Sequence, residues 1–284
     1  MNGTLCLARR NVLCYFRDRG SVVFSLMAVI IVVLLYLLFL RNMLVESYPD
    51  MDGMSQLIDA WVLAGILGIV PVTTSAGSLQ TMIEDRANGR VRDILVTPMS
   101  PARIAAGYIL STFLVGLIMS AFTMVLCVAY LAATGCPMSA SAIAVTAALL
   151  VPSSLSGSII VYSITSFFRS NGAFSGFFVV VSVLIGFLAG IYMPMGTMPE
   201  GMQIVGTLVP ASHMAALFRD SLAGEALNEV FTGAPADVLD GFKTDMGFDL
   251  GLGGFDFDPA TSMAYVLAVT AVFFIIAVVG IRRR

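Results

Sequence analysis

Few side chains in this sequence have the types and spacing that chemistry requires. The single histidine, His213, has no cysteine, histidine or carboxylate partner at metal-ligand spacing, which favours a structural or external-surface role over catalysis or metal binding. The four cysteines form no C-x-x-C pair, and we expect them to be buried as small apolar residues. No G-x-x-x-x-G-K-[ST] phosphate loop is present. We therefore expect no catalytic residue, no metal ligand and no cofactor site in this chain.

A second group of polar side chains lies between residues 223 and 260, a stretch that is acidic and rich in glycine. Four of its aspartates could bind a cation or an external partner, namely Asp245, Asp249, Asp256 and Asp258. They lack the D-x-[DN]-x-[DN]-G spacing of a calcium loop. We therefore favour a solvated and partly flexible external loop over this stretch.

The segment IEDRANGRVRDILVTPMSPARI, residues 83–104, is a short charged stretch between two long apolar ones. Its apolar residues recur with the spacing of one helix face. These residues are Ile83, Ala87, Val91, Ile94 and Leu95. Pro98 is expected to end this helix, and Pro101 to begin the next one. Two interpretations remain open on physical grounds: an amphipathic helix that presents charges of both signs to a partner, or a solvated loop.

The elements that must position these residues are strongly apolar. Hydrophobic residues make up 58% of the 284 residues, charged residues only 12%, and the mean hydropathy is +0.93. A soluble domain carries about 25% charged residues. Six stretches approach the ~20 apolar residues that a bilayer core requires: Val22–Leu40, Ile58–Ser78, Ile104–Leu131, Ile143–Phe167, Phe174–Ile191 and Met263–Ile281. Because they are continuously apolar, we predict an all-α membrane protein with six transmembrane helices in a single domain over residues 1–284.

Basic residues are distributed unequally between the two predicted sides of the membrane. Of the 15 Lys and Arg residues, all but Arg41, Arg219 and Lys243 lie in the N-terminal segment, in residues 79–103, in the loop after the fourth span or at the C-terminus. Cytoplasmic loops carry the excess of positive charge, so both termini and residues 79–103 are expected to face the cytoplasm. No basic patch has the size that nucleic-acid binding requires, so no nucleic-acid partner is expected.

Two shorter segments have an amphipathic or interrupted pattern. Residues 1–20 carry apolar residues at helical spacing, which favours an interfacial helix over a disordered tail. Within residues 192–222, an apolar run between Pro199 and Pro210 is too short to cross a bilayer, which predicts a re-entrant or interfacial hairpin. Such hairpins could form an external gate across a dimer axis, or they could only anchor the fifth span. The candidate gate residues are Pro194, Pro199, Val205, Leu208 and Pro210.

The spans contain almost no ionisable residues; Asp59 lies at the outer edge of the second. A proton-driven transporter normally needs Asp, Glu or His within the membrane, so a proton relay is not expected. Sodium coupling through hydroxyl oxygens, such as those of Thr73 or Ser153, remains open. If the protein is a pump, the absence of a phosphate loop means that its energy arrives from another subunit.

Several motifs resemble those of one family. The letters EDRANGRVRDILVTPMS, residues 84–100, resemble the first cytoplasmic loop of the ABC type-2 transporter permeases, with Arg90 where that family usually has Thr. Residues 190–224, which include GIYMP and PASH, resemble the external hairpin after the fifth span of the same family. The N-terminal letters RNVLCYFRDR are similar to its interfacial helix. The resemblance covers nearly the whole chain.

This resemblance implies a partnership. Residues 83–97 would be a coupling helix seated on a separate ABC ATPase subunit that binds ATP and Mg, and two permease subunits would pair as a homodimer or heterodimer. The implied ATPase-coupling residues are Glu84, Asp85, Arg86, Gly89, Arg90, Arg92, Asp93, Leu95 and Pro98. The implied function is the permease subunit of an ATP-driven exporter in the cell membrane, with an amphipathic or lipid-linked cargo. A self-powered secondary transporter or channel is the open alternative.

Overall fold

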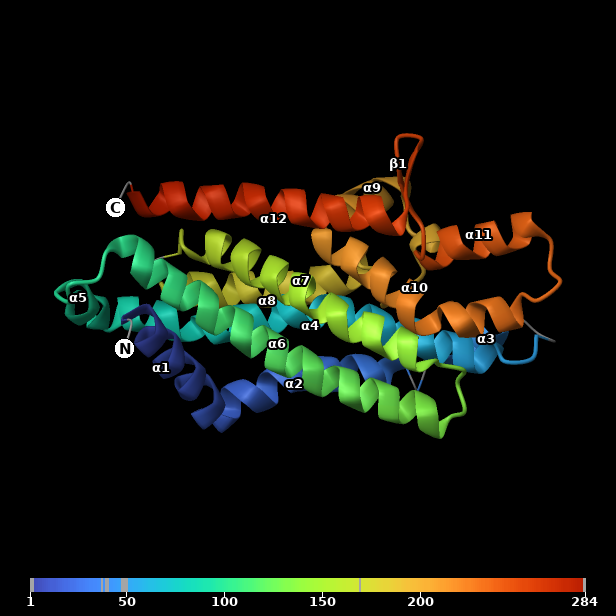
Figure 1. Ribbon diagram of the computed structural model, residues 1–284, viewed down its shortest axis with the longest axis horizontal. Coiled ribbons are helices and arrows are strands. Elements are labelled where there is room, and N and C mark those ends of the chain that lie inside the picture. Colours follow the sequence, from blue (N-terminus) through green and yellow to red (C-terminus); the bar gives the residue numbers. More distant parts are fainter. Residues whose placement is uncertain (1–2, 37, 39–40, 47–50, 169, 283–284) are drawn as a thin grey trace.

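The computed structural model describes residues 3–36, 38, 41–46, 51–168 and 170–282. This part of the chain is mostly helical, with one antiparallel hairpin of two short strands (Figure 1). In chain order the elements are α1 (Gly3–Arg17), α2 (Arg19–Leu35), α3 (Arg41–Glu46), α4 (Met54–Ala87), α5 (Arg90–Leu95), α6 (Pro101–Ala133), α7 (Ala140–Thr165), α8 (Asn171–Leu188), η2 (Met195–Thr197), α9 (Glu200–Leu208), α10 (Pro210–Val230), α11 (Ala236–Met246), β1 (Leu250–Leu252), β2 (Phe255–Phe257) and α12 (Pro259–Arg282).

Among the described residues, five helices are long and apolar enough to cross a membrane: α4, α6, α7, α8 and most of α12. They contain most of the second to sixth predicted spans. The first predicted span, Val22–Leu40, is covered by α2 as far as Leu35, and its residues 37, 39 and 40 lie outside the described residues. Helices α9 and α10 meet at an 87° bend and would be a further span only if counted together. The chain is thus a multi-pass helical membrane protein.

Helix α4 is the centre of the bundle. Of its most apolar window, 94% is buried inside the protein, since α6, α7, α8 and α10 all pack around it. A helix that is apolar on every side is expected in such a position. Close approach needs small residues: a Cβ atom at Gly68 would lie 2.7 Å from the Cα atom of Ala215 in α10. With 34 residues, α4 is about 51 Å long, longer than the ~30 Å hydrocarbon core.

The molecule has two distinct ends (Figure 1). The start of α1, helix α5 and the end of α12 lie together at one end, called here the α5 end. Helices α3 and α11 lie at the other, the α11 end. Within the described residues, three of the basic segments therefore reach the α5 end, at the start of α1, at α5 and at the end of α12. Helix α1 confirms a helix over most of residues 1–20, and it packs against α6.

The structure divides the segment 83–97, predicted to be one helix, between two helices. Helix α4 continues to Ala87, and a turn at Asn88 and Gly89 precedes α5. Gly89 has a φ of 75°, in the left-handed region that commonly ends a helix and that favours glycine. Helix α6 begins at Pro101 as predicted, and the hydroxyl of Ser100 accepts a hydrogen bond from the N–H of Arg103.

The stretch from residue 223 to residue 260 contains helices and a hairpin, so the prediction of a solvated and partly flexible loop is wrong. Helix α10 extends into it, and α11 and the β1–β2 hairpin follow. Phe231, Phe242 and Phe248 are buried and their rings pack against one another. The acidic and glycine-rich composition suggested solvation, but these aromatic side chains give the stretch an apolar core shared with the bundle.

Candidate functional site

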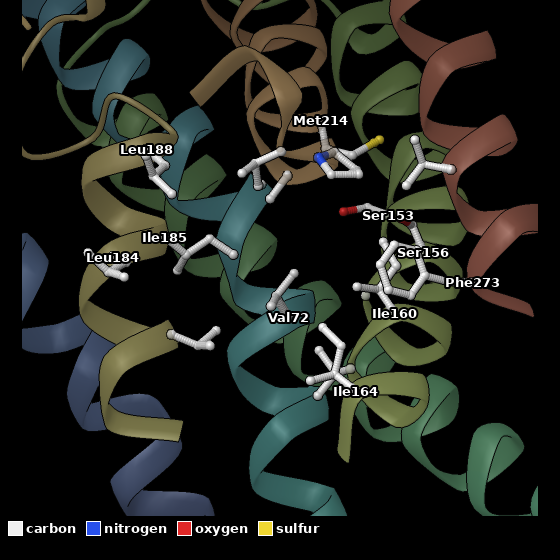
Figure 2. A pocket seen from close by; sticks show the side chains of 18 of the residues that line it. Val72, Ser153, Ser156, Ile160, Ile164, Leu184, Ile185, Leu188, Met214 and Phe273 are labelled. Carbon is white, nitrogen blue, oxygen red and sulfur yellow. The ribbon is translucent and has the colours of Figure 1, made fainter. Parts of the chain in front are cut away.

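An apolar cavity of about 350 Å³ lies inside the bundle (Figure 2). Its walls come from α4, α7, α8 and α12, and the corner between α9 and α10 closes one end. Leu184 and Leu188 of α8 face it from one side, and Ile160 of α7 and Phe273 of α12 face it from the other. The cavity has the size of a small-molecule site, which is typically about 300–1,000 Å³.

The α5 end contains a buried carboxylate, Asp85, near the end of α4. Its exposed fraction is 0%. Arg10 of α1 donates two hydrogen bonds to it, from Nη1 to Oδ2 and from Nη2 to Oδ1, the second at 2.8 Å. The hydroxyl of Tyr108 in α6 donates a third, at 3.1 Å. The hydrogen bond with Asp85 raises the pKa of Arg10. The ion pair joins α1 to α4, and the hydrogen bond from Tyr108 adds α6.

Arg90, the first residue of α5, extends this network. Its Nη1 atom lies 3.9 Å from Oδ1 of Asp85, at the limit of an ion pair. Arg86 points elsewhere: its Nη1 atom donates to the carbonyl oxygens of Ser166 and Phe168 after α7, both at 3.1 Å. The end of α4, which leads into α5, is therefore tied by side-chain contacts to α1, to α6 and to the segment after α7.

Three of the candidate coupling residues make contacts within the bundle, and their coupling role stays a prediction. Asp85 does not present its charge to a partner, because it is fully buried. Arg86 is committed to the end of α7, and Glu84 is half-buried and accepts a hydrogen bond from Gln80. Ile83 and Asp85 point to opposite sides of α4 and are both fully buried, so neighbouring elements cover this end of the helix on both sides.

The remaining candidates lie on an exposed surface, residues 88–98, called here the α5 tip. Gly89, Arg90, Asp93 and Pro98 are all exposed. Val96, which is not one of the predicted coupling residues, has an exposed fraction of 84%. The side chains of Arg92 and Leu95 lie outside the described part of the structure. The α5 tip therefore combines both signs of charge with an exposed apolar residue.

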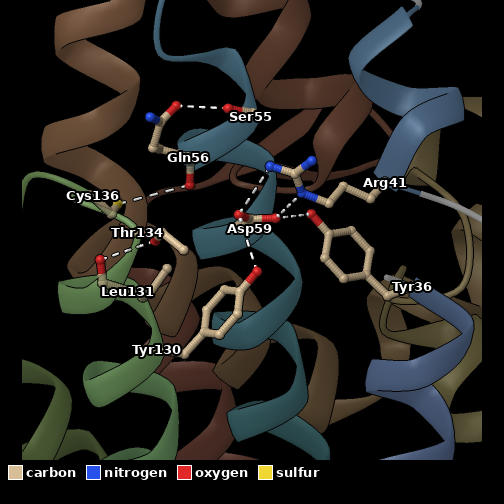
Figure 3. A network of polar contacts seen from close by, with 9 residues as sticks. All are labelled: Tyr36, Arg41, Ser55, Gln56, Asp59, Tyr130, Leu131, Thr134 and Cys136. Carbon is tan, nitrogen blue, oxygen red and sulfur yellow. Dashed lines mark hydrogen bonds and ion pairs between the residues drawn. The ribbon is translucent and has the colours of Figure 1, made fainter. Parts of the chain in front are cut away.

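The α11 end contains a second buried carboxylate (Figure 3). Asp59 is 1% exposed and accepts hydrogen bonds from the hydroxyl of Tyr36 at 2.6 Å and from Nε of Arg41 at 2.8 Å. The hydroxyl of Tyr130 in α6 lies at 3.5 Å. The hydrogen bond with Asp59 raises the pKa of Arg41. The ion pair with Arg41 thus joins α3 to α4, and the hydroxyl of Tyr130 adds a contact with α6.

The two carboxylates occupy opposite ends of the same helix. Asp59 and Asp85 are separated by a rise of about 39 Å along α4. A bilayer measures about 40–45 Å including its headgroups. This spacing suits one ion pair at each membrane surface, where the cost of a charge is smaller than in the hydrocarbon core. No sequence signal paired Arg10 with Asp85, since 75 residues separate them.

His213 and Arg219 of α10 are both structural. The ring of His213 is buried; Nε2 donates to the carbonyl oxygen of Thr207 at 2.8 Å, and Nδ1 accepts from the hydroxyl of Ser262 at 3.1 Å. Arg219 donates to three carbonyl oxygens, those of Ala189, Gly190 and Gly247. The guanidinium group also lies 4.8 Å from the centre of the Trp61 ring. Of the two roles expected for His213, structural or external-surface, the structure fits the structural one, because the ring is buried and both of its nitrogens have hydrogen-bond partners.

The five candidate gate residues do not lie in one environment. Val205 and Leu208 of α9 are exposed, as is Pro199 before it, whereas Pro194 is buried and Pro210 is half-buried. Leu208 and Pro210 also line the apolar cavity. Their function as a gate stays a prediction. In the described residues no group of three or more His, Cys, Asp or Glu side chains could hold a metal ion.

These features define a multi-pass helical membrane protein whose buried charges brace the two ends of one central helix. The description "ABC-2 family transporter protein" belongs to the family that matches residues 41–279. The chain therefore belongs to the ABC-2 transporter family, as the motifs predicted. The match begins at the start of α3 and so leaves out α1 and α2. None of the curated proteins matches the chain.

Proposed function

We propose that the chain is the permease subunit of an ATP-driven exporter. A separate ABC ATPase subunit binds ATP and Mg, a second permease subunit completes the pathway, and the cargo is amphipathic or lipid-linked. Both termini and the α5 tip face the cytoplasm, where the ATPase is located. Family membership supports the permease part of this proposal. The distribution of basic residues supports the orientation.

One observation supports an ATPase contact at the α5 tip: the tip is exposed, whereas the adjoining end of α4 is held in place by side-chain contacts. Arg90, Asp93 and Val96 are exposed, although the adjoining end of α4 is held by Asp85 and Arg86. A partner that displaced a flexible loop would transmit little force to the bundle. A tip mounted on a braced helix end instead passes its displacement to α1, α6 and α7. Such an element can have two positions that the nucleotide state of a partner biases.

The test uses two exposed valines at opposite ends of the molecule. Val96→Asp changes the α5 tip, and Val238→Asp changes the exposed face of α11. Neither side chain is buried, so both variants should insert and fold like the wild type. The chain is co-expressed with candidate ABC ATPase subunits, and co-purification and ATP-dependent transport in vesicles are measured.

We expect Val96→Asp to lose the ATPase and the transport, and Val238→Asp to keep both. Equal co-purification by the two variants would contradict a contact at the α5 tip. Transport that continues in vesicles without any ATPase would favour the alternative of a self-powered transporter. The ion pairs of Asp59 and Asp85 argue against these two groups as proton carriers, because each carboxylate already has an arginine partner.

A further inference from the structure

The apolar cavity lies between α8 on one side and α7 and α12 on the other. Helix α8 packs against α4 and α9 but makes almost no contact with α7 or α12 in the described part of the chain. Only 17% of its apolar window is buried within the protein. Figure 2 shows the consequence: Leu184 and Leu188 face Ile164 and Phe273 across open space, with Val72 of α4 between them. The cavity is therefore a slot beside α8, and it lies among membrane-spanning helices.

The dimensions of the slot decide what can fill it. Its lining on α8 runs from Phe177 to Leu188, a length of about 16 Å along the helix. A volume of about 350 Å³ over that length gives a mean cross-section of ~22 Å² for the centres of water-sized atoms, and adding an atomic radius of ~1.4 Å at each wall makes the slot ~8 Å wide. An α-helix with its side chains is about 10–12 Å across, so a partner's helix does not fit. An extended alkyl chain is about 4–5 Å wide, because non-bonded carbons approach to about 3.5–4.0 Å, and it fits.

The chemistry of the lining agrees with its shape. Nearly all of its side chains are aliphatic or aromatic, and none is charged. The only hydroxyls come from Ser153 and Ser156 of α7, both buried. Serine inside a helix normally bonds to its own backbone and is compatible with an apolar neighbour. An empty slot would deprive its walls of contacts on one side, whereas hydrocarbon supplied by the bilayer restores them.

We propose that this slot binds one unbranched acyl chain of a bilayer lipid, between α8 on one side and α7 and α12 on the other. The lipid's polar headgroup stays outside the slot, which has no charged group to receive it. The site lies within one chain and does not require a second permease subunit. It also requires no ATPase, so this proposal stands or falls independently of the proposed export.

Photolabelling tests the proposal on the full chain in lipid nanodiscs. The probe is a phosphatidylcholine with a diazirine in the middle of a straight acyl chain, and labelled residues are mapped by mass spectrometry. We expect label on Ile160 and Ile164 of α7, which line the slot. Val181→Trp fills the slot from α8 and should reduce labelling of α7 at least fivefold. The matched control, Val180→Trp, changes the adjacent exposed residue and should leave α7 labelling unchanged.

Three outcomes would overturn the proposal. Equal labelling of α7 in both tryptophan variants would mean that lipid reaches α7 without entering the slot. Absence of α7 labelling in the wild type, with normal labelling of the outer face of α8, would mean that something other than lipid covers the slot. A probe with a triphenylmethyl tail, which is wider than the slot, should not label α7 in the wild type, and equal labelling by both probes would refute an unbranched chain. This last comparison uses no variant and is unaffected by a folding defect.

Discussion

The ion pair between Arg10 and Asp85 is predicted to respond unequally to loss of its two members. The side chain of Asp85 is 0% exposed, whereas that of Arg10 is 37% exposed. In Arg10→Met the carboxylate remains buried without its main partner. In Asp85→Asn the arginine can turn toward solvent, and the asparagine can keep its hydrogen bond with Tyr108. Loss of Arg10, the more exposed member of the pair, should therefore reduce stability more than loss of the charge on Asp85.

The magnitudes follow from this difference in burial. Breaking a buried pair by removing one partner costs about 3–5 kcal/mol when a charge is stranded. Because Tyr108 and the more distant Arg90 still contact Asp85, we expect about 3 kcal/mol for Arg10→Met. We expect about 1.5 kcal/mol for Asp85→Asn, the lower value for a hydrogen bond to a charged group. The double variant Arg10→Met with Asp85→Leu removes both charges, and it should be more stable than Arg10→Met alone.

Thermal unfolding in one detergent measures these differences. Each kcal/mol corresponds to roughly 2–4 °C in a chain of this size, so Arg10→Met should lower the midpoint by about 6–12 °C. The matched control is Arg9→Met, which changes the exposed neighbour of Arg10 and should have little effect. The reasoning is refuted if Asp85→Asn lowers the midpoint as much as Arg10→Met, or if the double variant is the least stable of the three.

Further predictions concern the α5 tip and the α11 end. Gly89→Val should reduce ATPase coupling severalfold, and the control Gly135→Val should not. Both glycines have a positive φ and open space around them, but only Gly89 lies at the α5 tip. Equal losses of transport in the two variants would disprove this. Arg219→Met should cost about 3 kcal/mol and expose α11 to protease, since three carbonyl oxygens lose their donor; a protease pattern like the wild type would count against it. A cysteine at Val205 should react with an external reagent at a rate that changes when ATP is bound and hydrolysis blocked. A cysteine at Arg90 should resist external labelling in intact cells, and rapid labelling would reverse the predicted orientation.

The sequence predicted the long helices well, because their signal is simply the length of an apolar run. It also predicted the family, from motifs before α6 and after α8. The break at Gly89 was missed because a helical wheel places glycine on any face without penalty. The partners of Asp85 were missed because Arg10 and Tyr108 lie far from it along the chain. Such pairings depend on how helices pack, which no local pattern records.

The folded stretch after α10 was missed for a different reason. Its acidic residues and glycines are typical of solvated loops, and they outweighed the few aromatic residues in the sequence. Yet Phe242 and Met246 of α11 are almost fully buried, and the indole N–H of Trp61 donates to the carbonyl oxygen of Met246 at 2.6 Å. A few well-placed apolar side chains thus fold a segment whose average composition is polar.

The order of the charged residues along the chain has a consequence for biosynthesis. Arg10 precedes Asp85 by 75 residues, and Arg41 precedes Asp59 by 18. Ribosomes add about 5–20 residues per second, so each arginine is made seconds before its carboxylate emerges. A nascent chain that ends just after α4 therefore already contains both members of each ion pair. A chain that lacked α1 would have to insert α4 with the main partner of Asp85 missing, and its remaining described contacts, Arg90 and Tyr108, are both made after Asp85.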